Sequence, residues 1–344
     1  MSAKSAARKP AKARNQPKAS ENTAAGRSGT RSAMLIGLVG LVVVGAVVAF
    51  LVWQRDEPDA ALAAGTEPGV VAQVESLYND IYVYRRPNGF YVLSFGAERL
   101  RYTESVVNPH DELDLPVYYT QSMTAGLAYA PKLESAAIIG LGGGRTAWYH
   151  HKSVPGLAMT AVELDPAVAE IADTFFSVRD EDNFDVEILD GRMWLARNED
   201  RRFDIIMVDA YRGPFVPFHL LTREFYELVS DRLNPGGVVV QNVEPSTMLF
   251  DSAVATIASA FDNLVFFEGQ GNIVILAYDG PPRDEAEIAR LAAERQAEYG
   301  FRYPLPEILQ RRYMPEVGKA EAMTDDFAPV EYLKAIERHN EKRT

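Results

Sequence analysis

The chain has 344 residues, of which 47% are hydrophobic and 24% charged, so it can form one large or two small globular domains with appended segments. A formal net charge of −13 argues against a nucleic-acid-binding surface on the whole domain. The absence of cysteine excludes disulfides, thiolate zinc sites and cysteine nucleophiles, and five scattered histidines predict no metal site.

Residues 1–33 form a basic segment of low complexity. They carry eight Lys and Arg residues against one acid, Glu21, a net charge of +7, which leaves −20 for the remainder of the chain. The segment has almost no large apolar side chains, so it cannot bury enough surface to offset its ordering entropy. We predict a disordered tail, and the alternative of a basic arm attracted to anionic lipid headgroups stays open.

Residues 34–53 are twenty consecutive residues without a charge. As a helix they would span ~30 Å, the thickness of a bilayer hydrocarbon core. A buried core helix is rarely apolar on every side, and a cleaved signal peptide has a shorter apolar region closer to its cleavage site. The segment predicts a single transmembrane helix. Because basic residues crowd its N-terminal side, the tail is expected in the cytoplasm and the main domain outside it.

The remainder is predicted to contain a linker, 54–72, a small β subdomain, 73–131, and a larger domain, 132–280, followed by a C-terminal helical extension, 281–344. In the subdomain, two β-rich runs flank an Asn-Gly pair at 88–89, which predicts a tight hairpin. In the larger domain, apolar strands alternate with helical stretches, which indicates a parallel βαβ sheet. The predicted strands are 136–141, 159–163, 185–189, 205–208, 237–243 and 272–277. The extension is expected to contain helices at about 284–299 and 330–339.

A glycine loop follows the first of these strands, in the segment 138–146, IIGLGGGRT. Glycine lets a backbone turn tightly and approach a ligand, and the N-terminus of the following helix favours negative groups. A dinucleotide site would have the pattern G-x-G-x-x-G, whose third glycine is replaced here by Arg145. The spacing of Gly140, Gly142 and Gly144 favours instead the loop of S-adenosylmethionine-type folds, which bind a nucleoside without a pyrophosphate.

Three acids follow the ends of the next strands. Glu163 stands 21 residues after Gly142, where an acid can accept hydrogen bonds from both ribose hydroxyls. Asp190 and Gly191 follow the third strand, a suitable place to meet an adenine edge, and Asp209 ends the fourth. We therefore predict that four strand ends converge on one crevice, with the alternative that these are only turn residues.

The sequence resembles the spermidine synthase (polyamine aminopropyltransferase) family, and most closely its bacterial membrane-associated branch. The resemblance covers residues 74–335 and rests on segments 75–81 (ESLYNDI), 118–121 (YYTQ), 141–144 (LGGG), 162–166 (VELDP), 190–191 (DG), 203–209 (FDIIMVD), 233–241 (LNPGGVVVQ) and 324–331 (TDDFAPVE). It implies an α/β fold: a Rossmann-like class I S-adenosylmethionine-type sheet of seven strands after a small β-rich subdomain. It further implies a site for decarboxylated S-adenosylmethionine, no metal, and homodimers or tetramers.

Two positions depart from the family pattern. The glycine loop normally continues with an acid that faces the amine of the donor, and the loop after the fourth strand normally carries a second acid that takes a proton from the attacking amine. Arg145 and Arg212 stand there instead. Because arginine stays protonated and repels an ammonium, the two changes favour an anionic ligand, either intact S-adenosylmethionine or an anionic acceptor. Alternatively, the arginines pair with nearby acids.

The predicted catalytic residues are Asp209 and Arg212. The predicted donor-binding residues are Gly140, Gly142, Gly143, Gly144, Arg145, Glu163, Asp190 and Gly191, and the predicted substrate-binding residues are Tyr78, Tyr119, Tyr211 and His219. His150 and His151 are expected on a helix surface or in packing, and Asp325 and Asp326 in a C-terminal loop against the crevice.

Three functions stay open from the sequence. The first is aminopropyl transfer to a polyamine, and the second is methyl transfer from S-adenosylmethionine to a different, anionic substrate. The third is non-catalytic ligand binding on a membrane-anchored domain, which the expected topology favours because S-adenosylmethionine is made in the cytoplasm.

Overall fold

A computed structural model of the chain describes residues 69–97, 100–211, 215–245 and 250–328. The predicted tail, transmembrane helix and most of the linker lie outside these ranges, as does the helix expected at 330–339. Within the described ranges, no helix combines the length and hydrophobicity that a membrane span requires.

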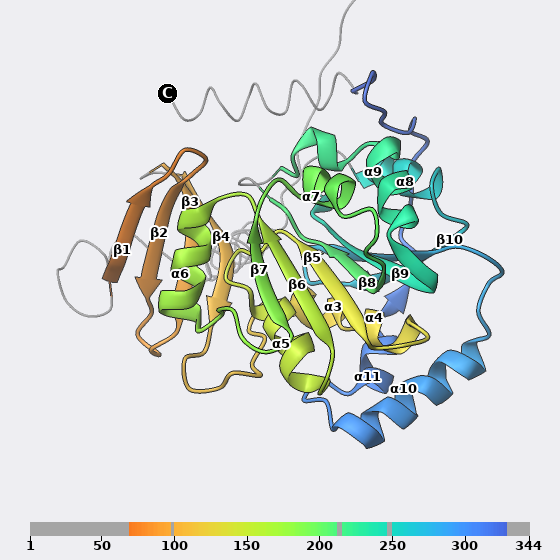
Figure 1. Cartoon of the computed structure of the whole chain (residues 1–344), viewed down its shortest axis with the longest axis horizontal. Helices are drawn as coiled ribbons and strands as arrows, with labels where there is room; N and C mark the ends of the chain where they lie inside the picture. The colour runs from red at the N-terminus through yellow and green to blue at the C-terminus, as the bar shows by residue number, and fades with distance from the viewer. Residues whose placement is uncertain (1–68, 98–99, 212–214, 246–249, 329–344) are drawn as a thin grey trace, which may run out of the picture. The chain divides into compact units, whose positions relative to one another are not determined.

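The first element is a four-stranded antiparallel sheet in which neighbouring strands in the sequence pair in order (Figure 1). Its strands are β1 (Gly69–Glu75), β2 (Asp80–Arg85), β3 (Tyr91–Ala97) and β4 (Leu100–Val107). The predicted hairpin is confirmed: β2 pairs with β3, and Gly89 adopts the positive φ of 85° that an Asn-Gly turn requires. On β2, Ile81 and Val83 pack into the main core, whereas Tyr82 and Tyr84 face a smaller cluster on the opposite side.

The second sheet has eight strands in the order β12-β10-β11-β9-β8-β5-β6-β7. The pairings among β5 to β9 are parallel, and those of β10, β11 and β12 are antiparallel. The strands are β5 (Ser135–Ile139), β6 (Ala158–Glu163), β7 (Phe184–Ile188), β8 (Phe203–Val208), β9 (Leu233–Val243), β10 (Asn263–Glu268), β11 (Ile273–Tyr278) and β12 (Arg312–Tyr313).

All six predicted strands of this domain are confirmed to within a few residues at their ends. The prediction did not include β10, and the seven strands implied by the family resemblance become eight because the two-residue β12 pairs with the outer edge of β10. The Rossmann-like order places the carboxyl ends of β5, β6 and β8 side by side, which is where open parallel sheets bind ligands.

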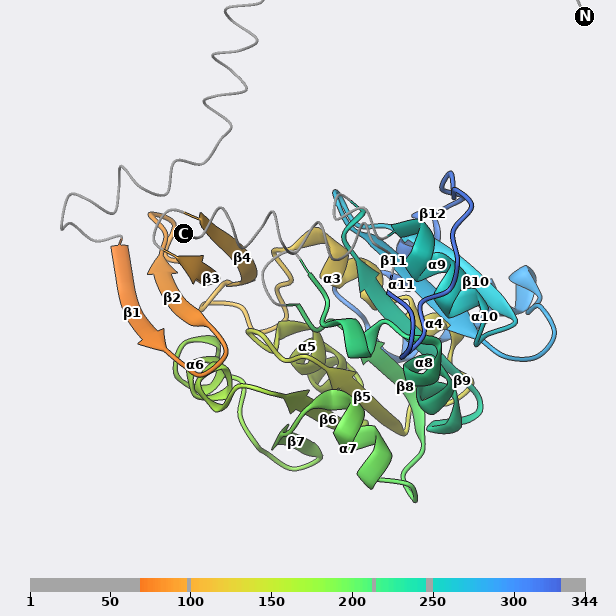
Figure 2. The ribbon, with the colours of Figure 1, turned by 90° about the horizontal axis from the view of Figure 1, so that it is seen from above.

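Helices cover both faces of this sheet (Figures 1 and 2). They are α3 (Tyr118–Met123), α4 (Gly126–Tyr129), α5 (Arg145–Ser153), α6 (Pro166–Phe176), α7 (Gly191–Arg197), α8 (Arg223–Asp231), α9 (Phe250–Ala258), α10 (Glu285–Tyr299), α11 (Leu305–Leu309) and the short 3-10 helix η1 (Phe218–Leu220). Alternate strand residues face opposite layers: Ile138 packs with α5 and α6, and Ile139 packs with α7, α8 and α9. The helix expected at 284–299 is confirmed as α10, with Asp284 as its N-cap.

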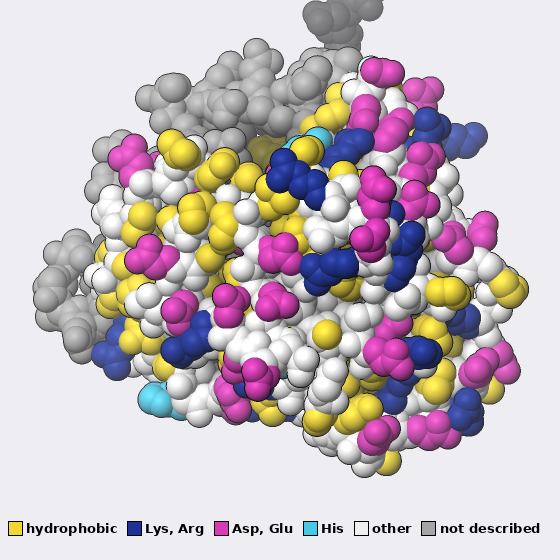
Figure 3. All heavy atoms as spheres, viewed as in Figure 1, with side chains coloured by type: hydrophobic (Ala, Val, Ile, Leu, Met, Phe, Trp, Pro, Cys, Tyr) yellow, Lys and Arg dark blue, Asp and Glu magenta, His cyan; other side chains and the backbone are white. Residues whose placement is uncertain are grey.

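The surface shows an uneven distribution of side-chain types on the face drawn in Figure 3. Acidic and basic side chains are interspersed over α7 and α8, and hydrophobic side chains are more frequent over the β1–β4 sheet and α6. On β1, Val70 and Val71 are each 43% exposed.

Candidate active site

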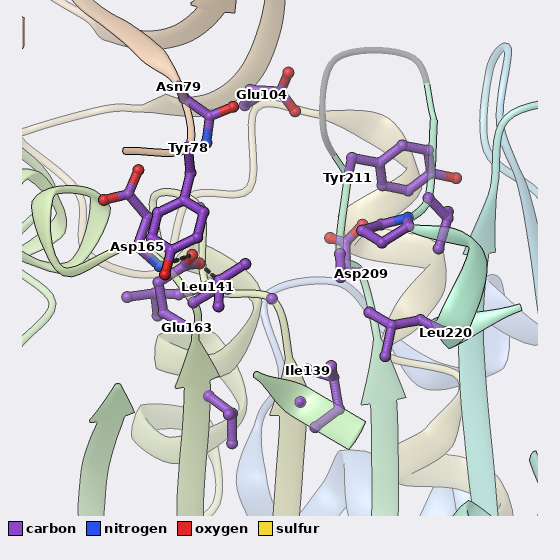
Figure 4. Close-up of a pocket in the computed structure, with 18 of the residues that line it drawn as sticks. Tyr78, Asn79, Glu104, Ile139, Leu141, Glu163, Asp165, Asp209, Tyr211 and Leu220 are labelled. Atoms are coloured by element: carbon purple, nitrogen blue, oxygen red, sulfur yellow. Dashed lines mark hydrogen bonds between the residues drawn. The ribbon is translucent and has the colours of Figure 1, made fainter. Parts of the chain in front are cut away.

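A cavity of about 690 Å³ lies at the carboxyl ends of β5, β6 and β8 (Figure 4). In this view Ile139 lies toward the base, Tyr78, Glu163 and Asp165 on one side, and Asp209 and Tyr211 on the other, with Glu104 and Asn79 above. The lining includes ten of the predicted site residues: Tyr78, Tyr119, Gly140, Gly142, Glu163, Asp190, Gly191, Asp209, Tyr211 and His219. The structure therefore brings together most of the predicted site.

The glycine loop is shaped by neighbouring backbone. Gly140 has φ of 94°, and a Cβ on it would lie 2.4 Å from the carbonyl oxygen of Asp209. Glycine is therefore required here by the approach of the residue that follows β8. Gly143 and Gly144 are not part of the cavity lining. The backbone N–H of Gly143 donates instead to Ser105 Oγ at 2.9 Å, which ties the loop to β4.

Glu163 and Asp165 organise the first side of the cavity. The Leu141 N–H donates to Glu163 Oε2 at 3.0 Å, and the Asp165 N–H donates to Glu163 Oε1 at 2.9 Å, so the carboxylate is fixed at the end of β6. Burial raises the pKa of Glu163, and these backbone donors oppose that rise. Asp165 caps α6 through the Ala167 N–H and also accepts a hydrogen bond from Ser76 Oγ. This last bond joins the β1–β2 loop to the side of the cavity that Glu163 and Asp165 form.

Asp190 is the N-cap of α7 and the partner of His219. Its Oδ1 accepts from the Met193 N–H at 3.0 Å, and its Oδ2 lies 2.6 Å from His219 Nε2. The His219 hydrogen bond is the main reason that the pKa of Asp190 is lowered. The segment that carries His219 is thus fixed against the third strand end.

The predicted C-terminal loop lies beside this pair. Arg192, the second residue of α7, donates from Nη1 and Nη2 to the two oxygens of Asp325 at 2.7 and 2.6 Å. The Asp325 N–H donates to Glu224 on α8. Asp325 therefore holds the loop against the helices next to the cavity and does not line it.

Asp209 is buried between two side-chain donors. Tyr119 OH donates to Oδ2 at 3.1 Å, and Asn242 Nδ2 donates to Oδ1 at 2.8 Å. Burial raises the pKa of Asp209 to about 6, although both hydrogen bonds lower it. Tyr211 OH donates to the Asn242 carbonyl oxygen at 2.9 Å, which fixes its ring beside this acid. A buried carboxyl group with a pKa near neutrality is suited to accept a proton.

Arg145 differs from the prediction. It begins α5, is only 5% exposed and is absent from the lining of the cavity. Its guanidinium donates to the carbonyl oxygens of Phe176, at 3.1 Å, and of Glu112. Burial lowers its pKa to about 10, opposed by Glu112, Asp114 and Asp111. The arginine thus connects the start of α5 to the backbone of Phe176 and of Glu112. Its positive charge is favoured there by the three nearby acids. Arg212 lies outside the described residues.

Substitution of Arg145 by Lys should therefore destabilise the fold without weakening donor binding. A single ammonium cannot reproduce both guanidinium contacts, so we expect a loss of about 1–3 kcal/mol in the free energy of unfolding. Chemical denaturation would measure this loss, and calorimetric titration would show a donor Kd within twofold of wild type. A tenfold weaker donor Kd with unchanged stability would contradict the position of Arg145 outside the cavity.

Sequence reasoning missed Glu104, on β4. The residue lines the same cavity, and its Oε1 is buried without a hydrogen-bond partner. Burial, and secondly the charge of Asp209, raise its pKa well above the ordinary value. The segment around it is β-rich and carries no glycine or strand-end signal. Only the fold of the β1–β4 sheet over the glycine loop brings Glu104 to the cavity.

His150 and His151 are expected in packing or on a helix surface, and the structure agrees with that prediction. His150 is buried, and its Nδ1 lies 2.8 Å from the Thr146 carbonyl oxygen. His151 Nε2 lies 2.8 Å from Glu181 Oε1. Over the described part of the chain, no group of three His, Asp or Glu side chains is arranged to hold a metal ion.

Comparison with known proteins identifies relatives of this chain in sequence and in fold. The family model described as "Spermine/spermidine synthase domain" matches residues 117–268. A polyamine aminopropyltransferase of Vibrio vulnificus is 31% identical over 278 residues, which cover 77% of this chain and 91% of that protein.

Two solved structures share the fold at lower identity. A probable spermidine synthase from Corynebacterium glutamicum aligns with a TM-score of 0.58 at 19% identity, over 75% of this chain and 97% of that one. A spermidine synthase in complex with the transition-state analogue AdoDATO aligns with a TM-score of 0.56 at 20% identity, over 72% of this chain and 84% of that one.

Proposed function

Because this chain belongs to the spermidine synthase (polyamine aminopropyltransferase) family, we propose that it transfers an aminopropyl group from decarboxylated S-adenosylmethionine to an amine. The observation that carries the proposal is the charge of the cavity. Its lining includes Glu104, Glu163, Asp165, Asp190 and Asp209, and none of the described lining residues is Lys or Arg. Such a cavity favours a donor with a sulfonium and an ammonium, and an acceptor that is itself an amine.

The nucleoside half of the donor is proposed to bind between the strand ends of β6 and β7. Glu163 has both oxygens held by backbone donors, yet a carboxylate has about four acceptor sites and can still accept from two ribose hydroxyls. Asp190 and Gly191 stand where the adenine edge would lie. Glycine is needed at position 191 because a Cβ there would meet Ile139 at 2.2 Å.

The proposed reaction is a displacement at carbon. The acceptor nitrogen attacks the aminopropyl carbon that is bonded to the sulfonium, a C–N bond forms, and the C–S bond breaks with its electron pair going to sulfur. The acceptor arrives as an ammonium and must lose one proton before attack. Asp209 is proposed to take that proton, because its pKa near 6 leaves it ionised at neutral pH while a buried site keeps it basic.

The alternative of an anionic substrate depended on two arginines facing the ligand. Arg145 donates instead to the backbone carbonyl oxygens of Phe176 and Glu112 and does not line the large cavity. Arg212 is placed next to the cavity only by its position in the sequence, three residues after Asp209. The acids of the described lining would repel an anionic acceptor, so their charge supports aminopropyl transfer over methyl transfer to an anion.

Incubation of the purified full-length protein, in detergent, with each donor tests the proposal. With decarboxylated S-adenosylmethionine and a diamine or polyamine, we expect 5′-methylthioadenosine and the aminopropylated amine in equal amounts by mass spectrometry. With intact S-adenosylmethionine we expect neither product. Methyl transfer from the intact donor would instead support the methyltransferase alternative, and binding of a donor without turnover would support a ligand-binding domain.

We also propose that residues 34–53 anchor the protein in the membrane, with the N-terminus in the cytoplasm. The positive-inside rule then puts the described domain outside the cytoplasm, whereas the proposed donor derives from a cytoplasmic metabolite. Reporter fusions at the C-terminus decide between these sides: one reporter active only in the cytoplasm and one active only outside it. A cytoplasmic signal would support enzymatic use of a cytoplasmic donor, and an external signal would favour a binding function.

A homodimer is proposed for the folded domain, as the family resemblance implies. The exposed Val70 and Val71 on β1, an outer strand of the β1–β4 sheet, support an interface on that sheet. Light scattering coupled to size-exclusion chromatography would give the mass of the protein after subtraction of detergent.

A further inference from the structure

Glu104 lines the cavity and carries a buried carboxylate oxygen that has no hydrogen-bond partner among the described residues. It belongs to β4, and its side chain lies above the cavity in Figure 4, with the carboxylate directed toward the side that carries Asp209 and Tyr211. Its Oε1 is buried, and no donor in the described part of the chain reaches it. A buried carboxylate without a partner is costly, so it must take up a proton, a water molecule or a cationic ligand group.

The two acids that face this part of the cavity differ in their partners. Both oxygens of Asp209 accept hydrogen bonds from protein side chains, Tyr119 and Asn242. Oε1 of Glu104 accepts none, and the histidine of the cavity, His219, is already engaged with Asp190. The fixed carboxylate is suited to receive a proton, and the unsatisfied one is suited to receive a charged N–H group.

A small adjoining pocket of about 20 Å³ links Glu104 to the glycine loop. Its lining includes Glu104, Leu141, Arg145, Thr146 and Asp209. The neighbouring Ser105 accepts the Gly143 N–H, so β4 is held against the loop that would contact the nucleoside donor. Glu104 therefore lies beside the glycine loop although the two are far apart in the sequence. Arg145 also lines the small pocket, but its guanidinium donates to the carbonyl oxygens of Phe176 and Glu112.

We propose that Glu104 binds the ammonium group at the end of the donor's aminopropyl chain and so selects the decarboxylated donor. The inference rests on the proposed function. An intact S-adenosylmethionine would bring its carboxylate toward two acids, Glu104 and Asp209, which would repel it. The charge that the family pattern places in the glycine loop is thus supplied from β4 in this chain.

The test compares three nucleosides by isothermal titration calorimetry on the full-length protein and its Glu104→Gln variant. Gln keeps the shape of the side chain and cannot take the negative charge that a bound ammonium would stabilise on Glu104. For decarboxylated S-adenosylmethionine we expect the variant to raise Kd by about 10- to 100-fold. For 5′-methylthioadenosine, which lacks the aminopropyl group, we expect a change of less than twofold. For intact S-adenosylmethionine we expect tighter binding, so that the preference between the two donors narrows.

The control is Glu134→Gln, which removes one negative charge from a side chain that is 70% exposed. It should leave all three constants within twofold of wild type. Equal weakening of the decarboxylated donor and of 5′-methylthioadenosine in Glu104→Gln would show a structural role and overturn the inference. An unchanged Kd for the decarboxylated donor would also overturn it. Absence of binding of any nucleoside to the wild-type protein would instead contradict the proposed function itself.

Discussion

Substitution of Asp209 by Asn should reduce kcat for aminopropyl transfer by about 100- to 10,000-fold, the range that a positioned general base contributes. Asn has nearly the same shape and cannot accept a proton at neutral pH. Donor binding should change little, because the nucleoside half of the donor is proposed to contact Glu163 and Asp190. Steady-state kinetics at saturating donor, with donor Kd measured separately, would distinguish loss of chemistry from loss of binding.

The pH dependence gives a second measurement on the same residue. Burial raises the pKa of Asp209 to about 6, and the ionised form is the base, so kcat should rise with pH through about 6 and level off above it. Asn at this position should remove that dependence. Tyr119→Phe removes a hydrogen bond that lowers this pKa, so the rise should move to higher pH.

The contribution of Asp209 to the free energy of unfolding should change with pH in the direction opposite to kcat. An acid whose pKa is raised in the folded state favours folding while it is protonated, and this contribution is lost as pH rises from the unfolded pKa toward about 6. At pH 8 the free energy of unfolding of Asp209→Asn, measured by chemical denaturation, should therefore be no lower than that of wild type.

The matched control for the kinetic measurements is Asp185→Asn, which changes an exposed acid on β7 and should leave kcat unchanged. A wild-type rate in Asp209→Asn with the pH rise intact would exclude Asp209 as the base.

Substitution of Glu163 by Gln should raise the donor Kd by about 10- to 100-fold, because hydrogen bonds to a charged group contribute about 1.5–3 kcal/mol each. Gln offers one acceptor oxygen for the Leu141 and Asp165 N–H groups, which already use both carboxylate oxygens in the wild type. The ribose hydroxyls therefore lose acceptor capacity. At saturating donor, kcat should stay within about threefold, since Glu163 is proposed to contact no reacting atom.

Comparing the Kd values of two ligands tests whether Glu163 binds the ribose. Because 5′-methylthioadenosine has the same ribose as the donor, Glu163→Gln should weaken both by a similar factor, measured by isothermal titration calorimetry. The Glu104→Gln variant should weaken only the ligand with an aminopropyl group. Retention of wild-type affinity for 5′-methylthioadenosine in Glu163→Gln would contradict ribose binding by this residue.

Much of the site could be predicted because it depends on local signals. Strand ends followed by an acid, at Glu163, Asp190 and Asp209, become neighbours in a parallel sheet, so their order in the sequence is enough to bring them together. A glycine-rich turn between a strand and a helix is a similarly local signal.

The failures concern side-chain direction and long-range contacts. Position 145 is the first residue of α5, and the sequence does not show whether its side chain points to the cavity or to Phe176 and Glu112. Glu104 reaches the cavity only because β4 packs over the glycine loop, a contact between segments some 38 residues apart that includes Ser105 and Gly143. No periodicity or motif encodes that contact.

The close approach of Gly140 to Asp209 affects how related sequences should be interpreted. A side chain at position 140 would collide with the carbonyl oxygen of Asp209 whether or not a nucleoside is bound. A relative that had lost its ligand but kept the pairing of β5 with β8 would still need glycine there. Glycine at position 140 therefore indicates that a sequence has this fold and does not indicate that it binds a ligand. A search for active homologues should instead examine the acids at positions 104, 163 and 209.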